Sequence, residues 1–321
     1  MAEIPKLSII IPAYQAEKFI TNTISKACEI HKQIEIVIVN DGSKDNTLNV
    51  CTELQRLYPS LKIFTQPNKG VSAARNLGIK HAQGQWIFFC DADDWIDAPN
   101  MEIILNRIGK AKDTIYLMAM NFVNPQPKGV VLHPVPNEVS FTPDEFLSSL
   151  SFQGSSCNYL FPADLIHKNH ITFPEGILNA EDQSFNIKCI CCSKNVYSIN
   201  LPIYNYNHLN ESSASHSNKS FKWRIGPLES ALDIIKFCIK KGIDIQIVST
   251  QIKRLVEYYY LYHIYGTHST QELKQIRSLL VQIAGYCPTI SKSPKFQVMK
   301  VNPKFGLFLL KKYNKFKFNK K

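Results

Sequence analysis

The sequence predicts an α/β fold in which a mixed, mainly parallel sheet is flanked by helices and followed by a C-terminal helical extension. In the first ninety residues, four short apolar runs rich in β-branched residues alternate with helical stretches. Continuous apolar runs of this length are typical of strands buried on both faces. Alternation of strand and helix favours βαβ units, which place helices on both faces of a sheet. The last hundred residues read as helices separated by glycine and proline.

The expected elements follow in order. Strands are expected over residues 7–11, 34–39, 61–65 and 86–90, and Pro12 is expected to stop the first of them. Helices are expected between these strands, over residues 16–31, 46–58 and 71–83. A further strand is expected over 196–201, and helices over 221–241, 243–265 and 271–285. Sheets of this kind bind ligands beyond the carboxyl ends of their strands, so polar residues that follow the strands are candidates for one site.

Clustered carboxylates follow the fourth expected strand. Asp91, Asp93 and Asp94 come directly after the apolar run 86–90. Two carboxylates one residue apart can converge on one ion where a strand ends and turns. Such oxygen ligands suit Mg²⁺ or Mn²⁺, which typically bridge a protein to substrate phosphates. Taken alone, the motif is more simply a solvated acidic turn.

Two polar clusters follow the first two strands. Pro12-Ala13-Tyr14 offers an aromatic face against which a base could pack. In Asn40-Asp41-Gly42-Ser43, Asp41 can accept a hydrogen bond from a base N–H, and Gly42 permits a close turn. Capping of the next helix by Ser43 or Asp45 is the structural explanation of the same segment.

A third cluster, Asn68-Lys69-Gly70, precedes an expected helix that carries Arg75 on its second turn. Arg75 can pair with a carboxylate of the site or with a phosphate. A lone arginine on a helix is more often a solvated charge. A functional role for Arg75 is therefore inferred only together with the neighbouring motifs.

In this order, these motifs resemble those of family 2 glycosyltransferases of the GT-A (Rossmann-like) fold. The resemblance rests on the segments Ser-Ile-Ile-Ile-Pro-Ala-Tyr, Asn-Asp-Gly-Ser, Asn-Lys-Gly-Val-Ser-Ala-Ala-Arg-Asn and Asp-Ala-Asp-Asp. It is close over residues 5–100 and looser to about 215. It implies an inverting transfer of a sugar from a nucleotide-diphosphate donor, expected to be a UDP-hexose or UDP-N-acetylhexosamine. The implied acceptor is a hydroxyl of a lipid-linked or cell-surface glycan, of the lipopolysaccharide or capsule type.

The resemblance also implies roles for individual residues. Asp93 would ligate Mg²⁺ or Mn²⁺ on the diphosphate with support from Asp91, and the ion would neutralise charge on the leaving group. One departure is Asn40, where many relatives carry an aspartate. The implied donor-binding residues are Pro12, Ala13, Tyr14, Asp41, Lys69, Arg75, Asp91, Ala92 and Asp93.

A general base is expected in the second half of the chain, because an inverting transfer needs a carboxylate to take the proton of the acceptor. The segment 179–185 resembles the Glu-Asp segment of the family, and Phe-Pro-Glu-Gly lies just upstream. The resemblance assigns the base to Asp182 and an orienting role to Glu181. Two acids that complement the dipole of a helix N-terminus are the simpler interpretation.

The segment 201–208 departs from the family pattern. Asn207 stands where relatives often carry an arginine, although Ser212, Ser213 and Ser215 follow as in the family. His208 can ligate the metal, bind a donor phosphate or be a neutral loop histidine. A tryptophan–lysine pair of the family is also absent near residues 157–159.

We expect a GT-A catalytic domain over residues 1–215, with a nucleotide-sugar-binding half (1–100) and an acceptor-binding half (101–215), and a helical region over 216–321. The segment 305–321 mixes large apolar side chains with lysines and has no acid. It is expected to lie on an anionic membrane surface. A disordered basic tail is the alternative, and nucleic-acid binding is not expected.

Composition fits an enzyme that touches membranes. The 321 residues suffice for one large core and a smaller unit. The net charge of +11 suits anionic donors and lipids. No apolar stretch approaches the ~20 residues of a membrane span, and no signal peptide is recognised. Nine scattered cysteines suggest reduced thiols, because the cluster 189–192 lacks zinc-site spacing. We therefore expect a cytoplasmic protein at the inner face of the membrane.

Two other classes of function use the same kind of fold. A catalytically inactive nucleotide-sugar-binding partner subunit of the same fold would not need both Asp93 and Asp182, so the presence of both favours an enzyme. A nucleotidyltransferase would carry a glycine-rich loop with Arg or Lys after the first strand, and Pro12-Ala13-Tyr14 does not fit that chemistry.

Overall fold

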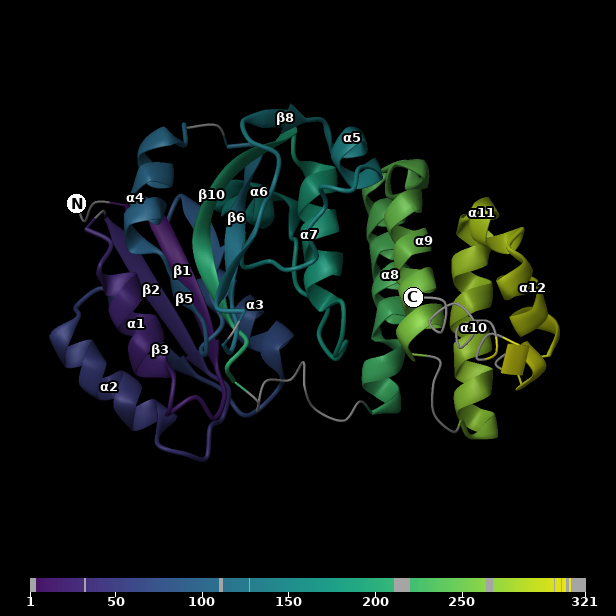
Figure 1. The fold of residues 1–321 in the computed structure, drawn as a ribbon, viewed down its shortest axis with the longest axis horizontal. Helices are drawn as coiled ribbons and strands as arrows, with labels where there is room; N and C mark the ends of the chain where they lie inside the picture. The colour runs from purple at the N-terminus through teal and green to yellow at the C-terminus, as the bar shows by residue number, and fades with distance from the viewer. Residues whose placement is uncertain are drawn as a thin grey trace. The chain divides into compact units, whose positions relative to one another are not determined.

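The computed structural model describes residues 4–31, 33–109, 112–126, 128–210, 220–263, 268–302, 304–306, 308–309 and 312. The chain divides into two compact units, drawn together in Figure 1. Unit 1 comprises Met1–Phe146, Ser155–Gly176 and Cys192–Ser217, and unit 2 comprises Leu147–Gly154, Ile177–Cys191 and Asn218–Lys321.

Unit 1 is built on one mixed sheet, whose strand order is β3-β2-β1-β4-β9-β6-β10-β5, with β7 beside β6 and β8 beside β10. Strands β1, β2, β3, β4, β6 and β10 run in one direction, and the other four run against them. This confirms the mixed, mainly parallel sheet. The strands are β1 (Leu7–Ala13), β2 (Ile34–Asn40), β3 (Leu61–Thr65), β4 (Trp86–Phe89), β5 (Trp95–Ile96), β6 (Thr114–Val123), β7 (Val130–His133), β8 (Val139–Phe141), β9 (Tyr159–Pro162) and β10 (Asn195–Asn207).

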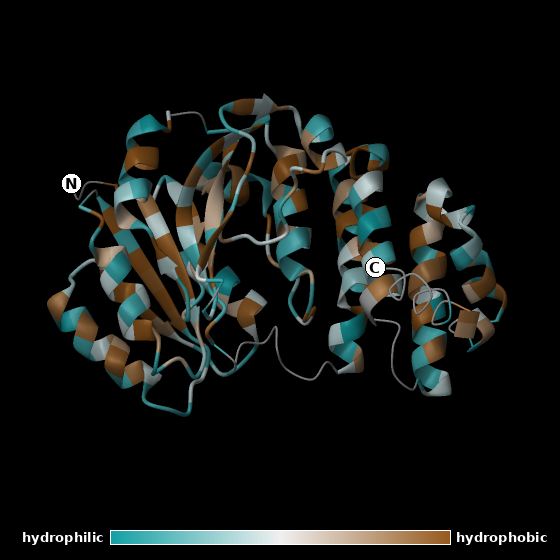
Figure 2. Ribbon diagram, viewed as in Figure 1, coloured by the Kyte–Doolittle hydropathy of each residue, from teal (hydrophilic) through white to brown (hydrophobic). Residues whose placement is uncertain are grey.

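Helices flank this sheet. Helix α2 packs on β2 and β3, α3 packs on β1 and β2, and α4 packs on β10. Strands β1, β2 and β4 are almost wholly buried, and Figure 2 shows β1 and β2 as mostly hydrophobic ribbons. The helices of this unit are α1 (Ile20–Cys28), α2 (Thr47–Leu57), α3 (Val71–His81), α4 (Ala98–Arg107) and α6 (Ala163–Asn169), while α5 (Pro143–Ser148) ends in unit 2.

Unit 2 is helical in its described part. The expected helix 221–241 is present as α8, and the described part of the expected helix 243–265 is a continuous helical stretch over 245–263 that changes from 3-10 to α to π along its length. It begins where the Asp244 side chain accepts a hydrogen bond from the backbone N–H of Gln246 and starts a 3-10 turn. The elements are α7 (Glu181–Cys192), α8 (Phe221–Lys241), η1 (Ile245–Val248), α9 (Ser249–Tyr258), the π-turn η2 (Tyr259–His263), α10 (Thr270–Tyr286), α11 (Pro288–Ser291) and α12 (Pro294–Val301).

The expectation that Pro12 stops the first strand is wrong. Strand β1 continues to Ala13, and Pro12 is paired in register with Val39. Ile10 accepts the last bond from the β4 side, from the backbone N–H of Cys90. Peptide groups alternate along a strand, so the missing N–H of Pro12 faces the side where β4 has already ended.

The first expected helix starts later than its pattern suggested. Residues 16–19 form a turn ahead of α1. The backbone N–H of Ala16 donates to Thr47 Oγ1 at 2.8 Å, and that of Glu17 donates to Asp45 Oδ2 at 3.3 Å. These side chains bind backbone groups from a distant loop, so the segment is held outside the helix.

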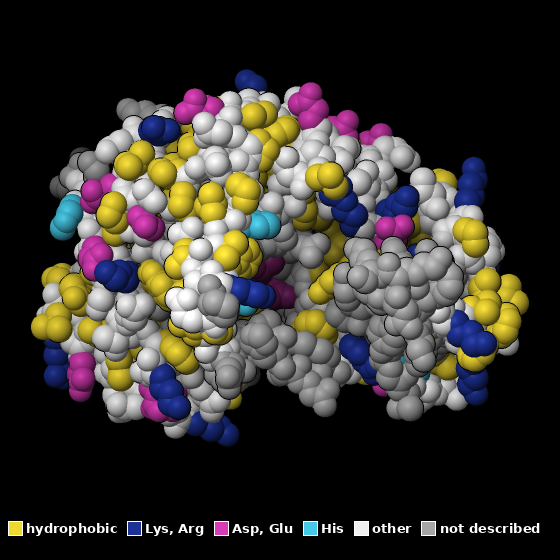
Figure 3. All heavy atoms as spheres, viewed as in Figure 1, with side chains coloured by type: hydrophobic (Ala, Val, Ile, Leu, Met, Phe, Trp, Pro, Cys, Tyr) yellow, Lys and Arg dark blue, Asp and Glu magenta, His cyan; other side chains and the backbone are white. Residues whose placement is uncertain are grey.

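The net charge of +11 does not gather into one basic surface in the view of Figure 3. There the Lys and Arg side chains are spread among acidic and apolar ones. In the described part of the chain, no helix is both long and apolar enough to cross a bilayer.

Glu35 is a buried carboxylate that joins three strands, and sequence patterns gave no sign of it. The residue is 2% exposed. It accepts hydrogen bonds from Ser8 Oγ at 2.5 Å, the Gly84 N–H at 3.0 Å and Lys62 Nζ at 2.6 Å, and also from the N–H of Gln83. Burial raises the pKa of Glu35, but the donors from Lys62, Ser8 and Gln83 outweigh it and leave the pKa below its usual value.

We expect Glu35→Gln to lower the free energy of unfolding by about 2 kcal/mol at pH 7, because an amide cannot accept all four bonds. A lowered pKa in the folded state gives stability that is present above the unfolded pKa of about 4.3 and lost on acidification. The difference from wild type should therefore change little between pH 7 and about 5 and shrink as the pH falls to about 4 and below in urea titrations. Lys62→Met, which removes only the half-exposed cation, should cost less than 1 kcal/mol. A constant difference across this pH range would refute the charge-based account.

Candidate active site

The polar clusters predicted from the sequence lie at one edge of the sheet in unit 1. Ala13 pairs with Asn40 and Asn40 pairs with Thr65, while Ile10 pairs with Phe89. Strands β1, β2, β3 and β4 are mutually parallel, so their carboxyl ends meet there. The segments 12–14, 40–43 and 91–94 leave this edge directly, and 68–70 leads from β3 into α3.

Asp41 ties the second cluster to the third. The residue is 3% exposed. Its Oδ1 accepts from Gln66 Nε2 at 2.7 Å and from the backbone N–H of Lys69 at 2.9 Å, and its Oδ2 accepts from the N–H of Gly70 at 2.8 Å. Gly42 has a φ of +70°, and a Cβ atom there would lie 2.7 Å from the backbone N of Asn68. Only glycine therefore fits this close turn, and the Lys69 loop is fixed at the rim.

The loops after β1 and β2 support each other. Ser43 Oγ accepts from the N–H of Gln15 at 3.1 Å, whereas Asp45 Oδ1 accepts from the N–H of Thr47 at 3.1 Å, where α2 begins. Of the two expected capping residues, Asp45 therefore binds the helix start. Tyr14 is 45% exposed, so its ring is accessible to solvent at this rim.

Arg75 pairs with the carboxylate cluster. Its guanidinium lies 2.8 Å from Asp91 Oδ1, and the side chain is 4% exposed. The same group lies over the ring of Phe173, 5.1 Å from its centroid. Of the partners considered for Arg75, the structure shows the carboxylate of the site. A buried guanidinium in this place offsets the charge of Asp91.

Side chains from the end of β10 hold the other two carboxylates. Asn210 Nδ2 donates to Asp93 Oδ2 at 2.7 Å. The N–H of Asn207 donates to Asp94 Oδ1 at 2.7 Å, and the Tyr204 hydroxyl donates to Asp94 Oδ2. Sequence reasoning missed all three partners. The Asn/Tyr-rich run at 204–210 was a weak signal, because nothing in it indicated contact with a motif more than 100 residues away.

Crowding of like charges shifts the acids of this cluster. Burial and the charge of Asp91 raise the pKa of Asp93. Burial and the charges of Asp91 and Asp93 raise the pKa of Asp94 to about 8. A group with such a pKa is mostly protonated at neutral pH, so the site avoids three ionised carboxylates next to one another.

The same cluster has chemistry suited to a divalent cation. Mg²⁺ commonly takes one or two carboxylates and completes its shell with substrate phosphates and waters. Asp91 and Asp93 offer such oxygens, and their mutual repulsion is what a cation would relieve. Within the described residues, no group of three or more His, Cys, Asp or Glu side chains is arranged to hold a metal.

His208 lies in an aromatic cluster. Its ring packs edge-on against Phe122 and Tyr206, with ring centroids 5.2 and 4.7 Å away, and its backbone N–H donates to Val123 O at 2.9 Å. Its role as a metal ligand stays a prediction. Ser212, Ser213 and Ser215 lie outside the described residues.

Glu181 and Asp182 form the first turn of α7, which lies in unit 2 up to Cys191. Two acids at this position complement the positive end of the helix dipole. That stabilising role is compatible with catalysis, and the base assignment for Asp182 stays a prediction.

Asp94→Asn should make stability less dependent on pH. Because the folded pKa of Asp94 lies above the unfolded value of about 3.9, its contribution to stability is complete below pH 4 and is lost as pH rises towards 8. The amide can donate to Tyr204 and accept from Asn207 without ionising. We expect wild type to lose about 2 kcal/mol relative to the variant between pH 5 and pH 8, less than an isolated group would lose, because neighbouring acids titrate together.

Thermal unfolding with EDTA at pH 5, 6.5 and 8 measures this difference. The exposed Asp144→Asn is the matched control and should show no such trend. Parallel pH profiles for wild type and Asp94→Asn would contradict the assignment of a neutral, buried Asp94.

Comparison with known proteins agrees with this architecture. The S. aureus TarS 1-349 crystal structure in complex with UDP-GlcNAc superposes with a TM-score of 0.75 at 20% identity, covering 96% of this chain and 90% of that chain. The likeness shows a shared GT-A fold that includes the helical C-terminal region.

Sequence relatives of this chain are bacterial proteins named as glycosyltransferases. The putative glycosyltransferase EpsH of Bacillus subtilis is 29% identical over 68% of this chain and 66% of that protein. The poly(ribitol-phosphate) beta-N-acetylglucosaminyltransferase TarS of Staphylococcus aureus is 30% identical over 57% of this chain and 32% of that protein. The chain thus matches less than two thirds of the length of these relatives. Residues 8–155 match the family model for Glycosyl transferase family 2. Residues 8–155 are therefore similar to a glycosyl transferase family 2 domain, in a chain that has the GT-A fold.

Proposed function

We propose that this protein is an inverting glycosyltransferase that moves a sugar from a UDP-hexose or UDP-N-acetylhexosamine donor to a hydroxyl of a bacterial cell-surface glycan. One observation carries the proposal: in a chain similar to family 2 over residues 8–155, the rim of parallel strands brings Tyr14, Asp41 and the Arg75–Asp91 pair to one edge with Asp93. A binding protein could use the same rim for a nucleotide. The crowded, charge-balanced carboxylates favour catalysis on a diphosphate over binding alone.

The donor half of the site is assigned to unit 1. The exposed ring of Tyr14 would stack on the base, and Asp41 Oδ2, which accepts from the backbone N–H of Gly70, would use its other lone pair for a base N–H. Asp93, supported by Asp91, would hold Mg²⁺ or Mn²⁺ against the diphosphate. When bound, such an ion neutralises charge that develops on the leaving group. Arg75, 2.8 Å from Asp91 Oδ1, would hold that carboxylate in a fixed direction.

The acceptor step is assigned to Asp182. Its carboxylate would take the proton of the acceptor hydroxyl as that oxygen bonds to the anomeric carbon and the carbon–oxygen bond to the diphosphate breaks. The products would be the glycoside and UDP, and an α-linked donor would give a β-linked product. Glu181 would orient the acceptor. TarS, named as an N-acetylglucosaminyltransferase and crystallised with UDP-GlcNAc, makes a UDP-N-acetylhexosamine a sensible first donor to test.

One solved structure gives indirect support to the proposal that the site binds a divalent cation. A mannosyltransferase from Pyrobaculum calidifontis, solved with GDP-Man and Mn²⁺, has the same general fold with a TM-score of 0.51 and 14% identity. That likeness concerns fold alone, so the metal and the UDP preference are both tested directly.

We also propose peripheral contact with an anionic membrane surface on the cytoplasmic side, where a lipid-linked acceptor would be found. In unit 2, Val301, Phe305 and Phe308 are 81%, 52% and 52% exposed. Lys312 lies over the ring of Phe308, 4.7 Å from its centroid. Exposed aromatic and basic side chains side by side suit a lipid interface. Residues 313–321, the most basic part of the expected segment, lie outside the described residues.

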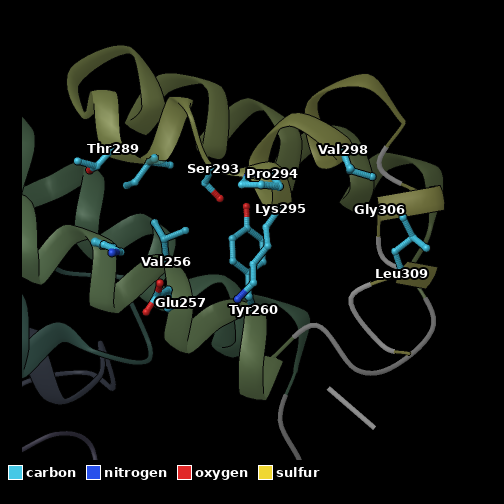
Figure 4. A pocket seen from close by; sticks show the side chains of 12 residues that line it. Val256, Glu257, Tyr260, Thr289, Ser293, Pro294, Lys295, Val298, Gly306 and Leu309 are labelled. Atoms are coloured by element: carbon cyan, nitrogen blue, oxygen red, sulfur yellow. The ribbon is translucent and has the colours of Figure 1, made fainter. Parts of the chain in front are cut away.

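An apolar cavity of about 420 Å³ lies in the same region, between α9 and the segments from α11 onward (Figure 4). Val256, Ile290 and Leu309 line it together with Lys253 and Lys295. It adds apolar surface close to the exposed side chains, and it carries no cluster of catalytic groups.

A donor screen tests the main proposal. We expect Mn²⁺-dependent thermal stabilisation and slow UDP release with one UDP-sugar, but not with GDP- or CMP-sugars. Asp182→Asn should lower UDP release at least 100-fold, because proton transfer loses its acceptor, and should leave the Kd for UDP within about twofold.

Each outcome of this screen is informative. Near-normal turnover by Asp182→Asn would show that the base lies elsewhere. Donor binding without turnover in wild type, with a glycan acceptor present, would favour the inactive partner subunit. No response to any nucleotide sugar would refute the donor class.

The membrane proposal predicts weaker binding to anionic vesicles after polar substitution of the exposed aromatics. The double variant Phe305→Ser/Phe308→Ser should bind phosphatidylglycerol vesicles at least tenfold more weakly in co-sedimentation, because it loses about 2 kcal/mol or more of apolar contact. Donor turnover without vesicles should stay unchanged. Leu57→Ser, at a residue 71% exposed in unit 1, is the control. Equal partitioning of the double variant and wild type would exclude this surface as the contact.

A further inference from the structure

The turn that leads into α7 has an unusual backbone. Ala180 has a φ of +65°, in the left-handed region that disfavours residues with a Cβ atom. Its carbonyl accepts the first bond of the helix, from the N–H of Ser184 at 3.1 Å. This turn sets the direction of the two residues that follow it, Glu181 and Asp182. Such a conformation persists only where the surroundings hold it.

Residues on one face of helix α8 contact this turn and keep it in that conformation. A Cβ atom on Gly226 would lie 2.5 Å from the carbonyl oxygen of Asn179, so only glycine lets the two backbones approach this closely. One helical turn later, Ser230 Oγ donates to the carbonyl oxygen of Ala180 at 2.9 Å, and Ser230 is fully buried. Both contacts fall on the two residues of the turn itself.

The next contact on α8 fixes the helix that follows the turn. Asp233 Oδ2 accepts from Ser184 Oγ at 2.6 Å and from Lys188 Nζ at 2.8 Å. The Lys188 side chain is only 5% exposed. Charge-assisted bonds of this kind are stronger than neutral ones, so α7 is prevented from rotating against α8.

The spacing of these contacts along the two helices gives the position of Asp182 around α7. Gly226, Ser230 and Asp233 fall at positions i, i+4 and i+7 of α8, which share one face. Gly226 and Ser230 meet Asn179 and Ala180 of the turn, and the partners within α7, Ser184 and Lys188, share one face of that helix. At about 100° per residue, Asp182 lies about 140° around the helix from the middle of that face. Gly226, Ser230 and Asp233, together called the clamp, therefore hold one face of α7. The Asp182 carboxylate lies on the other side of that helix.

We propose that Gly226, Ser230 and Asp233 are positioning residues that fix the orientation of the Asp182 carboxylate for proton transfer. The inference rests on the proposed function, because it takes Asp182 as the base. It adds that three residues of the helical region, none of which touches substrate, determine how fast the transfer proceeds.

Two measurements test it on the full-length protein. In hydrogen–deuterium exchange, Gly226→Ala and Ser230→Ala should increase exchange in peptides covering 179–186, while peptides from β1 and β4 stay as in wild type. In UDP release from UDP-N-acetylglucosamine with Mn²⁺, kcat should fall about 100-fold for Gly226→Ala, comparable to a 1 Å misplacement of a catalytic group, and about tenfold for Ser230→Ala. KM for the donor should stay within about twofold.

Gly285→Ala is the matched control. Gly285 is also in a helix of unit 2, but nothing lies within 4 Å of an added Cβ, so exchange and kcat should not change. In a double-mutant cycle, Ser230→Ala should cost nothing further on the residual turnover of Asp182→Asn, since both remove one function. A merely structural role predicts that the two losses multiply.

The outcomes separate this inference from the proposed function. Unchanged exchange over 179–186, or a faster exchange with normal kcat, would overturn the clamp. Normal turnover by Asp182→Asn alongside impaired clamp variants would instead overturn the base assignment. If no donor is hydrolysed by wild type, the proposed donor chemistry fails, and the exchange result still decides whether α8 holds the turn.

Discussion

Repulsion among the carboxylates at the end of β4 is the constraint that organises unit 1. Three acids within four residues cannot all be buried and ionised without opposing charge or hydrogen bonds. The opposing charge and the hydrogen bonds come from three separate parts of the chain. Arg75 on α3 pairs with Asp91, Tyr204 on β10 donates to Asp94, and Asn210 after β10 donates to Asp93. Each partner has to arrive at the same rim, so the placement of α3 and the long strand β10 are both tied to this cluster.

The sequence could predict the strands, the rim and the polar clusters on it, because apolar runs and the residues that follow them are local signals. Partners that reach the rim from afar were missed. Asn207, noted only as a departure from the family pattern, donates its backbone N–H to Asp94 and its side-chain amide to the carbonyl of Asp93. The prediction that Pro12 ends the first strand was wrong for a related reason. Whether a strand tolerates proline depends on where the neighbouring strand ends.

The helical region shows a second limit of pattern reasoning. Periodicity located α8 correctly, but it could not reveal that residues 177–191 pack with this region as one compact unit. That grouping depends on single atoms, such as the missing Cβ of Gly226 and the hydroxyl of Ser230. A helix of ordinary amphipathic appearance thereby holds a backbone conformation that Ala180 would rarely adopt alone.

The division of charge among the three carboxylates explains why two aspartates separated by one residue suit a cation at this rim. Arg75 offsets Asp91, and protonation neutralises Asp94, whose raised pKa follows from burial beside its neighbours. Asp93 has a raised pKa and an amide donor from Asn210, and it forms no ion pair within the described residues. A divalent ion would stabilise its ionised form and would meet only one uncompensated protein charge. Such an ion keeps most of its positive charge for a diphosphate, which is the balance that a site for charged leaving groups requires.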